Sequence, residues 1–152
     1  MKIDYIPLHY DRDWSWLQLV LPIPATDKTK GIIAVNVLED GSTEPVAAAL
    51  FDMWTITSVN VHWWMDTPLV IRHGFFHEIA KYVFQDCGKL LMTGIIPSSS
   101  TKSIKVAKHV GFEEVHRIKD GYDVGDDLVL LEGRLENADR WLAPMKTEEV
   151  AA

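Results

Sequence analysis

Residues 94–112 read GIIPSSSTKSIKVAKHVGF, and they decide the fold that we expect for this chain. An apolar strand breaks at Pro97, three serines follow, and a short helix then runs to Gly111. Any of the serines can cap this helix, because a serine hydroxyl accepts a hydrogen bond from a first-turn N–H group. Gly111 favours the left-handed conformation that ends helices. The helix is amphipathic, with Ile104, Ala107 and Val110 on its core side and Lys102, Lys105 and Lys108 opposite.

Apolar or alternating segments on both sides of this stretch predict strands. Asp40-Gly41 is a strong hairpin signal between two of them. Residues 11–21 are apolar on both faces, so they fit either a helix capped by Asp11 or Asp13 or a strand. The expected strands span residues 2–8, 31–38, 45–52, 57–65, 90–95, 113–119 and 128–135.

A second helix is expected between the strands at 57–65 and 90–95. Thr67 and Pro68 are favourable helix-start residues and Gly88 is a helix end, so one interpretation is a helix from 67 to about 86. In the other interpretation, residues 66–71 form a loop and the helix begins near Arg72. Either one connects two parallel strands by a right-handed crossover, which predicts an α/β fold.

Residues 100–112 resemble the helix that follows the fifth strand in the GNAT acyltransferase superfamily, roughly Asn-x-x-Ala-x-x-Leu-Tyr-x-Lys-x-Gly-Phe. When the closing Gly-Phe is aligned, Ser100 takes the Asn place, Ser103 the Ala place and Ala107 the usual tyrosine place. Residues 113–135 are similar to that family's closing hairpin, and residues 31–134 resemble short acetyltransferase-like proteins of bacteriophages. The resemblance implies a GNAT-like sheet, mixed and mostly antiparallel, splayed near its middle and with helices on both faces.

The resemblance also implies acetyl-CoA as co-substrate. In GNAT proteins its pyrophosphate lies on a loop before the long helix, usually Arg/Gln-x-x-Gly-x-Gly/Ala, where backbone N–H groups bind the anion. Residues 68–80 read PLVIRHGFFHEIA, which keeps Arg72 and Gly74 but lacks the further glycine. An ordinary helix with a solvated Arg72 is the alternative. The residues expected to bind the cofactor are Trp63, Trp64, Met65, Arg72, His73, Gly74, Phe75, Ser100 and Ser103.

His62 is the candidate general base. It lies in a polar row with Ser58 and Asn60 on one side of the strand at 57–65, and such a row indicates a cleft or a hydrogen-bonded face. Histidine titrates near neutral pH, and acyl transfer to an amine requires a base for the incoming ammonium. Ala107 cannot protonate the departing thiolate. Ser103 and Tyr122 are candidate donors, with water as a further one.

The composition limits the partners that we expect. The net charge of 15 − 22 = −7 disfavours nucleic-acid binding, including a DNA-modifying role. Apolar residues make up 47% of the chain, which predicts a packed core, but no uncharged run is long enough to span a bilayer. A single cysteine, Cys87, fits a reducing cytosol, so we expect a cytoplasmic protein, in the host cytoplasm if a phage encodes it. No histidine spacing indicates a metal site.

We expect a single GNAT-like domain over residues 1–142 and a frayed polar tail over 143–152. Two functions stay open. Arg72, Gly74 and the helix at 100–111 favour an acetyl-CoA-dependent N-acyltransferase whose amine acceptor is a small molecule or a protein. The altered loop and Ala107 favour a non-catalytic binding or regulatory protein of a phage. A tryptophan-rich strand edge would make a homodimer unsurprising.

Overall fold

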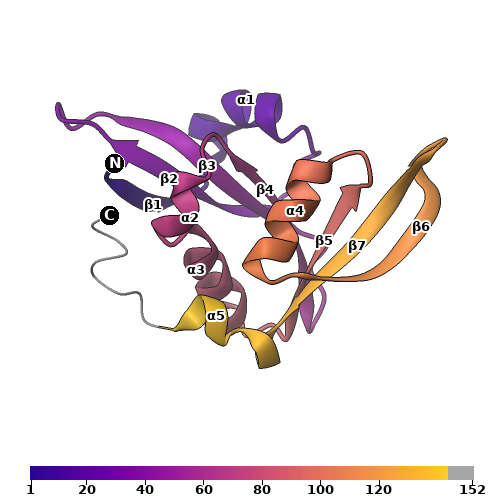
Figure 1. Ribbon diagram of the computed structural model, residues 1–152. Helices are drawn as coiled ribbons and strands as arrows, with labels where there is room; N and C mark the ends of the chain where they lie inside the picture. Colours follow the sequence, from indigo (N-terminus) through magenta and orange to yellow (C-terminus); the bar gives the residue numbers. More distant parts are fainter. Residues whose placement is uncertain (144–152) are drawn as a thin grey trace. The chain divides into compact units, whose positions relative to one another are not determined.

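The computed structural model of the protein describes residues 1–143 (Figure 1). Seven strands form a sheet in the order β1-β2-β3-β4-β5-β7-β6. The β4–β5 pair is parallel, whereas β1–β2, β2–β3, β5–β7 and β6–β7 are antiparallel. The predicted mixed, mostly antiparallel α/β fold is therefore confirmed. The strands are β1 (Ile3–Pro7), β2 (Lys30–Val37), β3 (Thr43–Asp52), β4 (Ser58–Met65), β5 (Leu91–Pro97), β6 (Glu113–Asp123) and β7 (Asp126–Arg134).

The first segment left open by the sequence is a helix, α1 (Tyr10–Val20). It begins before both aspartates that were expected to cap it. Asp13 instead accepts the backbone N–H of His9, the N-cap residue, from one turn inside the helix. The other helical segments are α2 (Leu69–Arg72), α3 (Phe75–Ala80), the π-helical η1 (Lys81–Asp86), α4 (Thr101–Val110), the 3-10 turn η2 (Leu135–Asn137) and α5 (Asp139–Leu142).

Neither predicted form of the second helix is correct, because the segment is broken in the middle. Gly74 has φ 86°, a left-handed conformation that glycine adopts without a Cβ penalty, and it separates α2 from α3. The loop expected at residues 66–71 thus contains most of a short helix, and the long helix starts at Phe75.

The described chain divides into two compact units. Unit 1 contains Met1–Asp52 and Val61–Ile79, and unit 2 contains Met53–Asn60 and Ala80–Leu142. A single domain over residues 1–142 and a sheet splayed near its middle stay predictions. The expected frayed tail lies, except for Ala143, outside the described residues.

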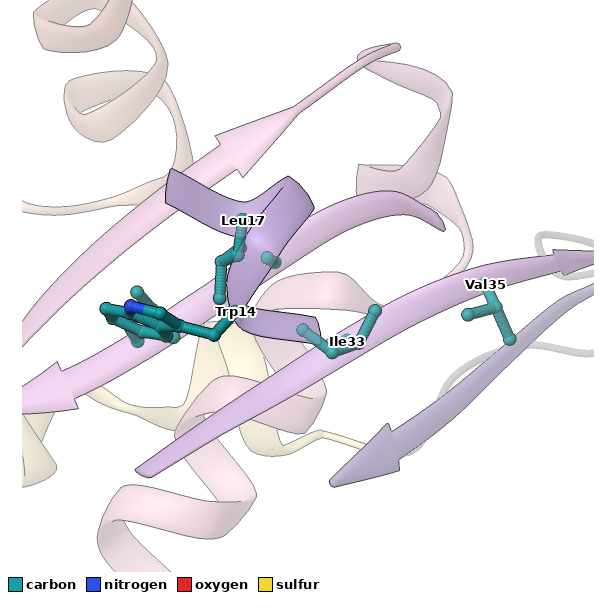
Figure 2. Close-up of a cluster of buried hydrophobic side chains, with 6 residues drawn as sticks. Trp14, Leu17, Ile33 and Val35 are labelled. Carbon is teal, nitrogen blue, oxygen red and sulfur yellow. The ribbon is translucent and has the colours of Figure 1, made fainter. Parts of the chain in front are cut away.

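In unit 1 the helices cover both faces of the strands, as expected. Trp14 and Leu17 of α1 pack on Ile33 and Val35 of β2, and Figure 2 shows these four side chains. Tyr5 pairs with Ala34, which alternates with Ile33 and Val35 and therefore faces the other way. The Tyr5 hydroxyl donates to the His73 carbonyl at 2.7 Å, so the α2–α3 junction lies on that opposite face.

In unit 2, β7 lies between β5 and β6, and Figure 1 shows β6 and β7 as a long hairpin. Gly133 of β7 pairs with Met92 of β5, and a Cβ at this glycine would lie 3.0 Å from Trp141 of α5. The Trp141 indole donates to the Val110 carbonyl at 2.7 Å, which ties α5 to the end of α4. A side chain at 133 would therefore require the tryptophan ring to shift by a few tenths of an ångström.

The helix α4 agrees with the prediction except at its cap. Ile104 and Ala107 are buried, and Gly111 ends the helix with φ 115°. Ser100 occupies the N-cap position without a side-chain hydrogen bond to the helix. The hydroxyls of Ser98 and Ser99 bond Asp126 at the start of β7 instead, at 2.8 and 2.6 Å.

Candidate active site

The predicted base, His62, is paired with a carboxylate. Its Nε2 lies 2.9 Å from Oδ1 and 3.0 Å from Oδ2 of Asp52. The two side chains keep 25% and 24% of their surface exposed. The imidazole is therefore neither sealed in the core nor loose in solvent, and a carboxylate holds its orientation.

The pair lies on the same side of the strands as α1. Asp52 alternates with Leu50, which packs under α1, and His62 alternates with Trp64, whose ring lies 6.1 Å from that of Trp16 in α1. Trp63 faces the other way, where its ring meets Phe76 of α3 edge-on at 5.2 Å. Trp63 and Trp64, which were both expected to bind the cofactor, thus lie on opposite faces of β4.

Asp52 is a site residue that the sequence analysis missed. The sequence did contain one signal for it: Asp52 ends the predicted strand at 45–52, and His62 lies in the next predicted strand, at 57–65. Antiparallel neighbours place such residues side by side, but the pairing requires a register, and the turn at residues 53–57 has no motif that sets one.

The α2–α3 junction holds the residues expected to bind the cofactor pyrophosphate. Arg72 is exposed at the end of α2, Gly74 and Phe75 are buried, and His73 contributes its carbonyl to Tyr5. Burial, and to a smaller extent the Glu78 carboxylate, raises the pKa of Tyr5, so its hydroxyl stays protonated and keeps donating.

Four backbone N–H groups of this junction are already engaged. Those of Val70, Ile71, His73 and Gly74 donate to carbonyls within the segment, at 3.1 to 3.4 Å. These four N–H groups are therefore not open to an anion, whereas the guanidinium of Arg72 is exposed.

The remaining predicted residues belong to unit 2. Ser103 is exposed on α4, and Tyr122 is 63% exposed within β6, not in the hairpin loop. Ala107, in the position of the usual tyrosine, is fully buried.

Hydrogen bonds, above all from Ser99 and then from Ser98, hold the pKa of Asp126 below its ordinary value. Asp126 therefore stays a carboxylate and fixes the turn before α4.

Solved structures with the same architecture are acetyltransferases. A variant of the spermidine N-acetyltransferase SpeG of Vibrio cholerae superposes with a TM-score of 0.71 at 8% identity, covering 91% of this chain and 95% of that one. The fold is that of the GNAT acetyltransferases. A candidate acetyltransferase of the GNAT family from Desulfovibrio desulfuricans gives 0.65 at 12% identity, covering 88% and 99%.

A third GNAT-fold structure, a candidate acetyltransferase from Acinetobacter baylyi, gives a TM-score of 0.69 at 15% identity, covering 89% of this chain and 94% of that one. No protein-family model matches the sequence, and neither does any curated protein. The likeness therefore lies in the GNAT fold and not in a shared sequence.

Two features typical of other protein classes are not found in residues 1–143. No helix in this part of the chain is long and apolar enough to cross a membrane. Among the same residues, no three histidine, cysteine or acidic side chains lie together as a metal site requires.

Proposed function

We propose that the protein is an acetyl-CoA-dependent N-acyltransferase that acylates an amine, with His62 as general base. The observation that carries this proposal is the half-buried pair formed by Asp52, at the end of β3, and His62, on β4, within a GNAT fold. A carboxylate that orients a histidine is a recurring arrangement where a proton must be removed from a nucleophile.

The contact with Asp52 supports a proposed proton path at His62. Because the Asp52 carboxylate only accepts, Nε2 carries the hydrogen, and the lone pair of the neutral ring is on Nδ1. Nδ1 takes a proton from the acceptor ammonium. The free amine then attacks the thioester carbonyl, the C–N bond forms, the C–S bond breaks, and the thiolate leaves and takes a proton.

The residues of unit 1 fit an acyl-CoA in part. Arg72 offers an exposed cation for the pyrophosphate next to the bend at Gly74, and His73 and Phe75 flank that bend. The backbone N–H groups of Trp63, Trp64 and Met65 are the proposed donors to the thioester carbonyl, a role in which fixed dipoles favour the developing oxyanion. In unit 2, Ser100 and Ser103 are the proposed further contacts.

The proton for the thiolate has two proposed sources in the chain, Ser103 and Tyr122. Both hydroxyls are exposed, so each is in exchange with water. Since a thiolate is a fairly good leaving group, solvent is a sufficient donor in this proposal, and substitution of either residue is expected to change the rate only modestly.

A thiol-release assay tests the proposed function. The wild-type protein should bind acetyl-CoA in a calorimetric titration and release CoA when amines are added. His62→Gln should lower kcat by roughly 100-fold, as expected for loss of a general base. His116→Gln, at an exposed histidine of β6, is the matched control. Absence of both binding and thiol release in the wild type would disprove the proposal.

The source and location of the enzyme are part of the same proposal. The resemblance of residues 31–134 to phage acetyltransferase-like proteins supports a phage gene, and the use of acetyl-CoA supports work in the cytoplasm of the host. Phage structural genes beside the coding sequence, and recovery of the expressed protein in the cytosolic fraction, are the expected results.

A non-catalytic binding or regulatory protein is the second candidate. The observation that favours it is the complete burial of Ala107, which leaves no hydroxyl where GNAT enzymes usually have their tyrosine. In this case the fold would be kept for a protein or small-molecule partner, and acetyl-CoA would neither bind nor be consumed.

A further inference from the structure

The side chains next to the Asp52–His62 pair are aromatic. Trp64 follows His62 by two residues on the same side of β4, a separation of about 7 Å along a strand. The ring of Trp16, from α1, lies 6.1 Å from that of Trp64 at an interplanar angle of 57°. Any group bound beside the imidazole on this side of the strand therefore meets two indoles.

The rings of Trp16 and Trp64 are held in place by packing on buried side chains and by a hydrogen bond. Both rings are half-buried and pack on the cluster of Figure 2. The Trp16 indole N–H donates to Asp13 at 3.3 Å, and Asp13 is itself buried and held by Arg12 at 2.7 Å. Burial raises the pKa of Asp13, but hydrogen bonds from Arg12, His9 and Trp16 outweigh it and leave the pKa below its ordinary value. The aromatic surface is thus preorganised, which reduces the entropy lost when a ligand binds.

The charges around the two indoles do not suit a polycation. Asp52 is engaged by His62, and Asp13 is engaged by Arg12. Asp66, just after β4, is exposed to water, where an ion pair contributes little. One ammonium can lie near the Asp52–His62 pair. A further ammonium on the same ligand would lie near the tryptophan rings, which attract cations but provide no carboxylate partner.

We propose that the acyl acceptor is a primary amine whose neighbouring group is aromatic or aliphatic and packs on Trp64 and Trp16. The inference rests on the proposed function and names its substrate class. Trp64 is the proposed specificity-determining residue, because it lies two residues from His62 on the same side of β4 and its ring is 6.1 Å from that of Trp16.

The test compares phenethylamine and hexylamine with ethanolamine and spermidine in the thiol-release assay. We expect kcat/KM to be at least about tenfold higher for the first two, the difference that aromatic and apolar packing typically gives. Trp64→Ala should raise the KM for phenethylamine by about tenfold more than it raises the KM for ethanolamine. Trp64→Phe should retain most of the preference, and Leu19→Ala, at an exposed residue of α1, is the control.

Binding of phenethylamine, measured by quenching of tryptophan fluorescence in wild type and Trp64→Phe, separates this inference from the proposed function. Binding without thiol release would overturn the acyltransferase proposal and keep the amine site. Thiol release with spermidine or ethanolamine as efficient as with phenethylamine would overturn the amine class and keep the enzyme. Absence of both binding and turnover with every amine would overturn both.

Discussion

His62 shows how much a single neighbour determines at the residue scale. On its own, a histidine in a strand has two tautomers and several rotamers. Asp52, at 2.9 Å, selects the tautomer with the hydrogen on Nε2 and fixes the ring. The chemistry that we assign to His62 therefore belongs to the pair, and both members should be sensitive to substitution.

Asp52→Asn tests this dependence. The amide can donate to Nε2, so it favours the tautomer with the hydrogen on Nδ1 and removes the basic nitrogen from the acceptor side. We expect kcat to fall by roughly 10- to 100-fold, less than or equal to the loss in His62→Gln. A double-mutant cycle measured by thiol release should show strong non-additivity. Additive losses would show that the two residues act independently.

Ala107→Tyr tests the position where the chain departs most from the GNAT pattern. Ala107 is fully buried, so a phenol there overfills the packed interior of unit 2, at a cost of about 1–3 kcal/mol of the free energy of unfolding. Urea denaturation measures the change. A stable variant that binds acetyl-CoA would instead indicate that a cavity is open beside α4.

At the scale of elements, the sequence predicted those segments whose pattern is local. Each strand and α4 were found because alternation and capping glycines are set by neighbouring residues. The break at Gly74 was missed because a glycine inside an apolar helical pattern looks tolerable until its φ is known. Asp52 was missed because its partner depends on the register between strands. Residues 11–21 stayed open because apolar residues such as Leu19, which is exposed, also lie on the solvent side of α1 and hide the helical period.

Leu17→Ala should show that α1 is a main stabilising element of unit 1. Leu17 is fully buried in the cluster with Trp14, Ile33 and Leu50, so truncation should cost about 2–5 kcal/mol of the free energy of unfolding. Leu19→Ala, two residues away and 85% exposed, should change it by no more than about 0.5 kcal/mol. Equal effects in urea denaturation would contradict the packing of α1.

The contact between the serine turn and β7 should appear as a pH dependence. Because the pKa of Asp126 in the folded protein is depressed by Ser99 and Ser98, its contribution to stability is present above the ordinary value of 3.8 and is lost as pH falls through the folded-state value. We therefore expect Asp126→Ala to lower Tm at pH 7 and to approach wild type in strong acid. Asp27→Ala, at an exposed loop residue, should lower Tm at neither pH.

At the scale of the whole molecule, the proposed co-substrate should stabilise the folded chain. A ligand at 100 times its Kd adds about 2.7 kcal/mol to the free energy of unfolding, so saturating acetyl-CoA should raise Tm by several degrees. Arg72→Glu should abolish most of this rise without changing Tm in the absence of ligand, because an exposed arginine contributes little to folding. An equal rise in wild type and variant would locate the phosphates elsewhere.

The strand order of unit 2 also constrains the order in which the chain can fold during its synthesis. β7 is the last strand to be synthesised, yet it lies between β5 and β6, and its pairing joins Leu91 to Arg134 across more than forty residues of chain. Such a long closure is entropically costly and slow compared with hairpin formation. Until Asp126–Arg134 has left the ribosome, the side of β5 that β7 covers has no partner, so a nascent chain exposes an apolar strand from the synthesis of β5 until that of β7. Most of unit 1, residues 1–52 and 61–79, is synthesised before β7, so this part can begin to fold before the central strand of unit 2 is made.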